Sequence, residues 1–157
     1  MATEIERKFL VRNESWRSHV SSGIFYRQGY MATTTTCSMR VRCGGDQGFV
    51  NLKSATLGIT RKEYEYPIPE QDANEMLDLF CDRPLIEKTR YLVEHAGHIW
   101  EVDVFAGDNE GLIVAEIELD DADESFELPD WAGEEVSHDS RYYNVCLVKN
   151  PFKNWRA

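Results

Sequence analysis

Basic residues are missing from a long stretch of this chain. No Lys or Arg occurs between Tyr91 and Ser140, a stretch that holds 16 Asp and Glu residues. The first 90 residues, in contrast, carry 13 basic and 12 acidic side chains. The formal net charge of the whole chain is -11, which argues against nucleic acid or an anionic membrane surface as a general partner. Charge is therefore sorted along the chain, and the sorting needs a structural explanation.

Long apolar runs and paired cysteines are also missing. No apolar run approaches the roughly 18 residues expected of a membrane-spanning helix. The first residues include Glu4 and Glu6 instead of a basic region followed by an apolar run, so we expect no secretory signal. The chain has four cysteines and no C-x-x-C pair: Cys37, Cys43, Cys81 and Cys146. This usage favours reduced thiols over a disulfide framework or a zinc site. We therefore expect a cytoplasmic protein.

The composition is that of a folded protein of ordinary size. Of the 157 residues, 42% are hydrophobic and 29% are charged, which excludes a disordered chain. A chain of this length can bury a hydrophobic core that is stable without disulfides or structural metal ions. No linker or internal repeat divides it, so we expect a single domain over residues 1–157.

The pattern of apolar residues and turns predicts a mainly β fold of the α+β class. Strands are expected near 3–12, 24–32, 37–43, 48–54, 60–68, 85–94, 98–105 and 112–119. Helices are expected near 14–20, 70–81 and 139–149. Glycine-rich turns at 44–48, 95–98 and 107–111 leave short loops between strands, which implies antiparallel pairing. Eight such strands with few helices predict a closed eight-stranded antiparallel β-barrel with the helices packed outside.

Charged residues recur at every second position on the predicted strands. Glu4, Glu6 and Lys8 share one strand face, because side chains two residues apart on a strand point the same way. The same spacing recurs in Arg40-x-Arg42, Asn51-x-Lys53, Lys88-x-Arg90, Glu101-x-Asp103 and Glu116-x-Glu118. For one strand, such alternation usually marks the solvent face of a half-buried antiparallel sheet. Here the signs segregate, with basic pairs at 40–53 and 88–90 and acidic pairs at 101–118. Segregated charge favours a sheet that holds a polyanion and a metal ion.

The apolar faces of the same strands decide which way the charges point. Val41, Val50, Trp100, Val102 and Ile117 alternate with the charged positions. If these residues point outward under helices, the charged faces line a tunnel inside the barrel. Dry charges in an interior are costly unless they pair or bind a ligand. A water-filled tunnel that binds a polyanion removes that cost.

The ordered set of charged motifs resembles a known family. Glu4-x-Glu6-x-Lys8 is similar to the E-x-E-x-K signature of the CYTH superfamily, the triphosphate tunnel metalloenzymes. The other elements follow in the family's order: Arg40-x-Arg42, Lys53, Arg61-x-Glu63-x-Glu65, Lys88-x-Arg90, Glu101-x-Asp103, Glu116-x-Glu118 and Arg141-Tyr142-Tyr143-Asn144. The resemblance covers nearly the whole chain and points to the small bacterial members that hydrolyse inorganic triphosphate in a metal-dependent reaction. It implies an eight-stranded barrel around a tunnel.

The residue types support a division of roles within such a tunnel. Arg binds phosphate bidentately and Lys supplies a point charge, so we expect a phosphate clamp formed by Arg40, Arg42, Lys53, Lys88, Arg90 and Arg141. Mg²⁺ or Mn²⁺ prefers oxygen ligands, so the metal candidates are Glu4, Glu6, Glu116 and Glu118, with Asp103 as a weaker one. A supporting role that orients the clamp or the ligands is expected of Arg61, Glu63, Glu65 and Glu101.

The resemblance also suggests catalytic residues, and several alternatives stay open. Lys8 acts with Tyr30 in positioning or deprotonating the attacking water, although Tyr30 also fits an ordinary core position. Arg141 reaches the tunnel mouth or pairs with nearby acids. His95 and His98 sit at a turn and are poor metal candidates. A class IV-type adenylate cyclase, an organic triphosphatase and a non-catalytic module that binds phosphorylated ligands are the alternative functions. The resemblance favours a homodimer.

Overall fold

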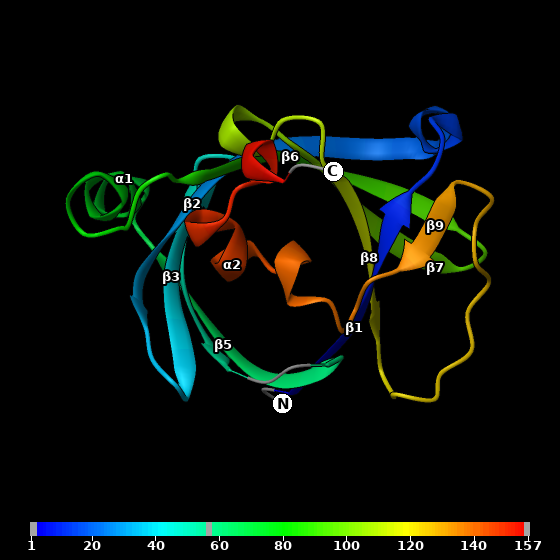
Figure 1. Cartoon of the computed structure of the whole chain (residues 1–157), viewed down its shortest axis with the longest axis horizontal. Coiled ribbons are helices and arrows are strands. Elements are labelled where there is room, and N and C mark those ends of the chain that lie inside the picture. The colour runs from blue at the N-terminus through cyan, green and yellow to red at the C-terminus, as the bar shows by residue number, and fades with distance from the viewer. Residues whose placement is uncertain (1–2, 56–57, 156–157) are drawn as a thin grey trace.

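The computed structural model describes residues 3–55 and 58–155, and a barrel of eight antiparallel strands dominates it (Figure 1). The barrel strands are β1 (Thr3–Val11), β2 (Val20–Thr33), β3 (Cys37–Gly44), β4 (Gln47–Ser54), β5 (Thr60–Ile68), β6 (Ile86–His95), β7 (His98–Phe105) and β8 (Ile113–Leu119). Their order is β5-β4-β3-β2-β6-β7-β8-β1, and pairing between β5 and β1 closes the ring. The expected closed eight-stranded antiparallel barrel is confirmed.

The N-terminal strand β1 closes the barrel. It pairs with β8 from Ile5 to Leu10 and with β5 through residues 3–5. Beyond the contact with β5, the same edge of β1 pairs with a ninth strand, β9 (Ala132–Glu135). The sequence analysis did not predict β9, because four residues of the type Ala-Gly-Glu-Glu show no strand alternation.

Two of the expected turns have the backbone geometry that tight hairpins need. Ala96 and Gly97 between β6 and β7 both have positive φ angles, 49° and 82°. Gly45 and Asp46 between β3 and β4 have φ angles of 59° and 64°. Two successive positive φ angles match the twist of the flanking strands in two-residue hairpins. These turns fix the register of both hairpins.

The helical segments differ from expectation in one important place. The segment expected at 14–20 is a 3₁₀ helix, η1 (Ser15–His19), and α1 (Glu70–Leu79) is close to its predicted range. The segment expected at 139–149 is broken into η3 (Ser140–Tyr142) and α2 (Asn144–Lys149). Tyr143 separates them with an extended backbone at φ -75° and ψ 135°. Two further 3₁₀ turns are η2 (Gly107–Asn109) and η4 (Phe152–Asn154).

The apolar core lies mainly outside the barrel wall. Ala73 and Leu77 of α1 pack with Val41 and Cys43 of β3, as the outward position of the apolar faces predicted. A second outer cluster is rich in aromatic residues and includes Phe9, Trp16, Trp100, Phe126 and Trp131. No helix among the described residues is long and apolar enough to cross a membrane. Because the apolar side chains pack on the outside, the inner face is left to the charged residues.

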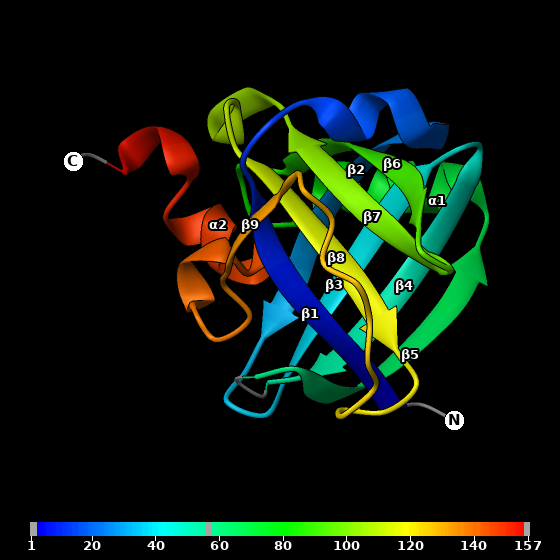
Figure 2. The same ribbon diagram turned by 90° about the vertical axis from the view of Figure 1, so that its right-hand side faces the viewer.

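The C-terminal segment lies across one end of the barrel (Figures 1 and 2). Leu147 and Val148 of α2 belong to one buried cluster with barrel residues Tyr30, Ile86, Phe105, Leu112 and Val114. Ile86 and Val114 continue the strand faces that carry Lys88 and Glu116, so the inner wall changes from charged to apolar at this end. The helix α1 thus packs on the outer wall as expected, whereas α2 covers one end of the barrel.

Candidate active site

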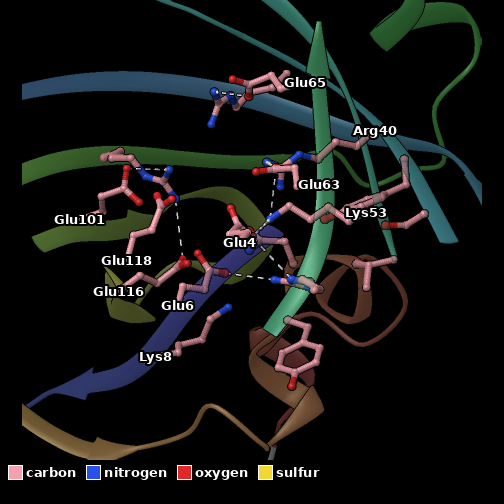
Figure 3. A pocket seen from close by; sticks show the side chains of 18 of the residues that line it. Glu4, Glu6, Lys8, Arg40, Lys53, Glu63, Glu65, Glu101, Glu116 and Glu118 are labelled. Carbon is pink, nitrogen blue, oxygen red and sulfur yellow. Dashed lines mark hydrogen bonds and ion pairs between the residues drawn. The ribbon is translucent and has the colours of Figure 1, made fainter. Parts of the chain in front are cut away.

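The charged strand faces line one cavity inside the barrel, with a volume of about 180 Å³ (Figure 3). Its cationic side chains are Lys8, Arg40, Arg42, Lys53, Arg61, Lys88 and Arg90. Its acidic side chains are Glu4, Glu6, Glu63, Glu65, Glu101, Glu116 and Glu118. The remaining lining residues are Tyr30, Ser38, Tyr143, Asn144 and Val145. Every predicted site residue except Arg141 and Asp103 lines this cavity, while the roles of these residues remain predictions.

The two signs of charge occupy different parts of the wall. Most of the cations come from β3, β4 and β6, whereas Glu4, Glu6, Glu116 and Glu118 come from the adjacent strands β1 and β8. The cavity contains seven side chains of each sign, so it has no large net positive charge of its own. A polyanion that enters it would therefore be held more firmly with further positive charge, which a divalent cation bound beside it would supply.

The register between β1 and β8 brings the predicted metal carboxylates together. Glu6 lies opposite Glu118, and Lys8 lies opposite Glu116. The carboxyl groups of Glu6 and Glu116 are within hydrogen-bond reach of each other. Glu116 also has a basic neighbour from β6, since Arg90 Nη2 lies 3.7 Å from Glu116 Oε1. The two acidic pairs nonetheless share one wall of the cavity.

Burial and neighbouring charges separate the protonation of Glu4 from that of Glu6. Burial, with the negative charge of Glu6 added to it, raises the pKa of Glu4 to about 8. Burial has the same tendency at Glu6, but the positive charges of Lys53, Lys8 and Arg61 outweigh it and hold the pKa of Glu6 well below its usual range. The same wall therefore holds one carboxyl that keeps its proton more readily, Glu4, beside one that loses it more readily, Glu6.

The predicted clamp residues on β3 and β4 are held by acids from β1 and β5. Lys53 Nζ lies 3.3 Å from Glu4 Oε1 and 3.5 Å from Glu63 Oε2. Arg42 Nη2 lies 3.2 Å from Glu65 Oε2. The buried Nε atoms of Arg40 and Arg42 have no hydrogen-bond partner in the described part of the chain. Unpaired buried donors of cationic side chains are suited to binding an anionic ligand.

A buried amide to which the sequence assigned no role, that of Asn51, supports the same acids. Asn51 Nδ2 donates to Glu63 Oε2 at 3.1 Å and to Glu65 Oε2 at 2.7 Å. Asn51 shares a strand face with Lys53, and that spacing was the available signal. An amide is uncharged, however, so the charge pattern alone did not single it out.

Asp103 is committed to cations of the neighbouring strand. Its carboxylate accepts from Lys88 Nζ at 2.8 Å and from Arg90 Nε and Nη2 at 2.8 and 2.9 Å. Asp103 is almost fully buried and does not line the cavity. Because both oxygens are engaged, the geometry disfavours Asp103 as a metal ligand and makes it the group that orients Lys88 and Arg90.

Arg141 is likewise not brought into the cavity. Its side chain is 59% exposed and binds Asp139, with Nη2 at 2.7 Å from Oδ2. The extended backbone at Tyr143 ends η3 before α2 begins and leaves Arg141 on the outer side of the segment. Of the two alternatives that the sequence left open for Arg141, the structure shows the local ion pair. The acid involved is Asp139, two residues before Arg141 in the chain.

Lys8 lies at the end of the cavity that the C-terminal segment covers (Figure 3). Its Nζ atom donates to the carbonyl oxygen of Tyr142 at 3.2 Å and lies 5.4 Å from the centroid of the Tyr143 ring. Tyr30 is buried and also lines the cavity. It therefore fits both alternatives that the sequence left open, a core position and a position on the cavity wall. Tyr143 and Asn144 were recognised only as part of a motif, and the structure places both on the cavity wall.

The donor set fits a divalent metal bound together with a ligand. No group of three or more His, Cys, Asp or Glu side chains is gathered as a metal cage within residues 3–55 and 58–155. Mg²⁺ usually takes one or two carboxylates and completes its shell with phosphate oxygens and waters. The adjacent Glu6 and Glu116 carboxyl groups satisfy that smaller requirement. His95 and His98, in contrast, lie on the β6–β7 hairpin in contact with Glu127 and Glu124.

The apolar core of this barrel lies mainly outside its wall, and charged side chains line the cavity inside it. These two features together define a class of proteins. The model of the CYTH domain matches residues 2–145 of this chain. The chain therefore belongs to the CYTH domain family, and the resemblance recognised in the sequence is confirmed.

Particular relatives lie close in sequence. The chain is 49% identical over 156 residues to the inorganic triphosphatase of Acetivibrio thermocellus, with 99% of each chain covered. It is 40% identical over 150 residues to the inorganic triphosphatase of Nitrosomonas europaea, covering 93% of this chain and 97% of the relative. It also superposes on a crystal structure of an inorganic triphosphatase with a TM-score of 0.66 and 36% identity, covering 92% and 97% of the two chains.

Proposed function

We propose that this protein hydrolyses inorganic triphosphate to diphosphate and phosphate in a metal-dependent reaction. The observation that carries the proposal is the cavity, in which unpaired Arg donors face a wall of paired carboxylates. The names of two relatives with 49% and 40% identity support the same activity. Among the described residues, Val145 is the one aliphatic residue that lines the cavity, so this lining offers little aliphatic surface to a nucleoside base.

The cationic wall is the proposed clamp for the phosphate chain. We assign Arg40, Arg42, Lys53, Lys88 and Arg90 to it, because each lines the cavity and is held by a carboxylate. Phosphoryl transfer needs charge neutralisation and in-line positioning more than covalent chemistry. A clamp whose side chains are fixed in advance supplies both without rearrangement during the reaction.

The acidic wall is the proposed metal site. Glu6 and Glu116 are the main candidates for binding Mg²⁺ or Mn²⁺, with Glu4 and Glu118 beside them on the same two strands. When bound, a divalent cation neutralises phosphate charge and lowers the pKa of a bound water. Arg61 Nη2 lies 3.1 Å from Glu6 Oε1 and fixes the orientation of that carboxylate.

Lys8 and Tyr30 are the proposed catalytic pair. The Lys8 ammonium is fixed by the Tyr142 carbonyl at 3.2 Å, which leaves two N–H groups for the cavity. We therefore assign Lys8 the role of a charged donor that holds the attacking water or a phosphate oxygen, and Tyr30 a neighbouring position on the wall.

A phosphate-release assay tests the proposal. The purified protein is assayed with inorganic tripolyphosphate, longer polyphosphate, ATP and thiamine triphosphate, each with Mg²⁺, with Mn²⁺ and with EDTA. We expect release from tripolyphosphate with a divalent metal and none with EDTA. Preferential turnover of ATP or thiamine triphosphate would instead indicate a nucleotide or organic triphosphatase. Binding without release in any metal would indicate a binding module.

We further propose a single domain, a cytoplasmic location and a homodimeric state. One barrel accounts for the described residues, and the four cysteines are unpaired, which fits a reducing compartment. The homodimer rests on the family resemblance and is tested by light scattering at several protein concentrations. No role in binding nucleic acid or membranes is proposed for a chain with a net charge of -11.

A further inference from the structure

Asn144, the first residue of α2, joins two buried side chains of the barrel wall. Its Oδ1 atom accepts a hydrogen bond from Lys88 Nζ at 3.3 Å and another from Gln28 Nε2 at 3.2 Å. Gln28 comes from β2 and is fully buried, and Lys88 comes from β6 and is 1% exposed. The amide therefore ties the C-terminal segment to two neighbouring strands at the level of the cavity.

The hydrogen-bond inventory of Lys88 shows what this contact does. An ammonium group has three N–H donors. One is used by Asp103 Oδ2 at 2.8 Å and a second by Asn144 Oδ1. Among the described residues no third acceptor lies against Lys88 Nζ, and the nearest ring, Phe105, has its centroid 5.6 Å away. Because Lys88 lines the cavity, the third N–H remains for a ligand there. Two fixed acceptors determine the direction of that third donor, whereas Asp103 alone would leave the ammonium free to rotate.

We propose that Asn144 is a positioning residue of the phosphate clamp, an inference that rests on the proposed function. It directs the free N–H of Lys88 toward the bound phosphate chain, and Gln28 holds the amide in place from behind. The C-terminal segment is then part of the binding site as well as the cover of one barrel end.

The neighbouring contact at Lys8 supports this role for the segment. The carbonyl of Tyr142 accepts from Lys8 Nζ, and the Tyr143 ring lies beside the same ammonium. Three successive residues, 142–144, thus contact lysines from β1 and from β6. The extended backbone at Tyr143 separates η3 from α2 and lets the segment reach both strands.

A double-mutant cycle on tripolyphosphate binding tests the inference. The variants are Asn144→Ala, Lys88→Met and both together, and the dissociation constant of inorganic tripolyphosphate is measured by calorimetry in EDTA. Asn144→Ala is expected to weaken binding about tenfold in the wild type and to change nothing in the Lys88→Met background. In assays with metal, KM for tripolyphosphate should rise by a similar factor. Equal weakening in both backgrounds, or unchanged affinity of Asn144→Ala, would overturn the inference.

Two further variants keep the test decisive. Asn74→Ala is the matched control, because Asn74 accepts from Arg27 on the outer surface at 3.1 Å and lies outside the cavity. It should leave affinity unchanged. If Asn144→Ala does not fold, Gln28→Met replaces it and should weaken binding only when Lys88 is present. Because binding is measured without turnover, a wild type that binds but does not hydrolyse tripolyphosphate rejects the proposed function and leaves this cycle interpretable.

Discussion

Among the cavity lysines, Lys8 has the contacts that best distinguish a role in catalysis from a role in substrate binding. Lys8 is buried at the end of the cavity that the C-terminal segment covers. Its ammonium donates to a backbone carbonyl, whereas each lysine of the proposed clamp pairs with a carboxylate. We predict that Lys8→Ala lowers kcat for tripolyphosphate about 100-fold, in the range of proton-transfer and positioning groups. KM should change far less, because the missing donor would act mainly in the transition state. Steady-state kinetics with metal measure both constants.

The control for this prediction is a lysine on the opposite face of the wall. Lys62 of β5 is exposed and donates to Thr3 Oγ1 at 2.7 Å outside the cavity. Lys62→Ala should retain both constants. A raised KM with a preserved kcat in Lys8→Ala would make Lys8 a clamp residue and refute its catalytic role.

Arg42 illustrates the clamp at the level of one side chain. Its guanidinium lies 4.7 Å from the centroid of the Tyr26 ring and 5.3 Å from that of Phe49, and its Nε atom has no partner in the described chain. We predict that Arg42→Ala raises KM and lowers kcat/KM by a factor equivalent to roughly 2–4 kcal/mol. Arg27→Ala, on the outer face of β2, is the control. Equal kinetics in the two variants would leave a solvent-facing interpretation of Arg42.

At the scale of elements, an ion pair fixes the end of β9 to β1. Arg7 Nε and Nη2 donate to the two oxygens of Glu135, and Ser137 Oγ donates to Glu135 Oε2 at 2.6 Å. The Arg7 hydrogen bond holds the pKa of Glu135 below its usual value of 4.5. A carboxylate with a depressed pKa stabilises the fold above its unfolded pKa, and this stability is lost as pH falls through the folded pKa.

The expected result is a pH-dependent effect of removing that pair. We predict that Arg7→Met lowers the unfolding free energy at pH 7 by about 0.5–1 kcal/mol, since the pair is partly exposed. The difference from the wild type should shrink as pH falls below about 4.5. Urea unfolding at several pH values measures it. Arg17→Met is the control, because its pair with Glu14 is more exposed, and a pH-independent difference would contradict the assignment.

The elements themselves were largely predictable, and the exceptions have physical reasons. Alternation of charged and apolar residues located the eight barrel strands, and paired turn residues located the tight hairpins. The break at Tyr143 was not predictable, because helical spacing continues from Ser140 into α2 while the extended backbone there depends on tertiary contacts. Tyr143 Oη donates to the Ser137 carbonyl oxygen at 2.7 Å, a contact that no local pattern reveals.

At the scale of the whole molecule, the buried cations and acids should make the free energy of unfolding depend on whether a polyanion is bound. Arg40 and Arg42 keep unpaired donors inside the barrel, and a bound polyanion would satisfy them. We predict that tripolyphosphate at 100 times its dissociation constant, in EDTA, stabilises the fold by about 2.7 kcal/mol. The expected rise in Tm is roughly 5–10 °C for a domain of this size. Thermal unfolding measures it, and an equal rise in sodium chloride of the same ionic strength would contradict specific binding.

The candidate site was predictable as a set of residues but not as a set of contacts. Spacing by two placed Glu4, Glu6 and Lys8 on one face, and order along the chain supplied the remaining charged motifs. Which acid serves which cation depends on register across strands. Asp103 therefore appeared as a metal candidate although it binds Lys88 and Arg90. Arg141 appeared as a phosphate ligand because a motif does not show which way a short helical turn faces.

Closure of the barrel through β1 has a consequence for how the protein acquires its activity. The N-terminal strand meets β8 and β9, more than a hundred residues later in the chain, and its contact with β5 spans only three residue pairs. Strands that are far apart in the sequence pair slowly, because the entropy cost of closing the intervening loop comes before the stabilising contacts form. During synthesis, Glu4 and Glu6 are made long before the strand that carries Glu116, and β1 cannot pair with that strand until it has been made. Metal-binding competence should thus appear in the last cooperative step of folding, together with the barrel, and not in any N-terminal fragment.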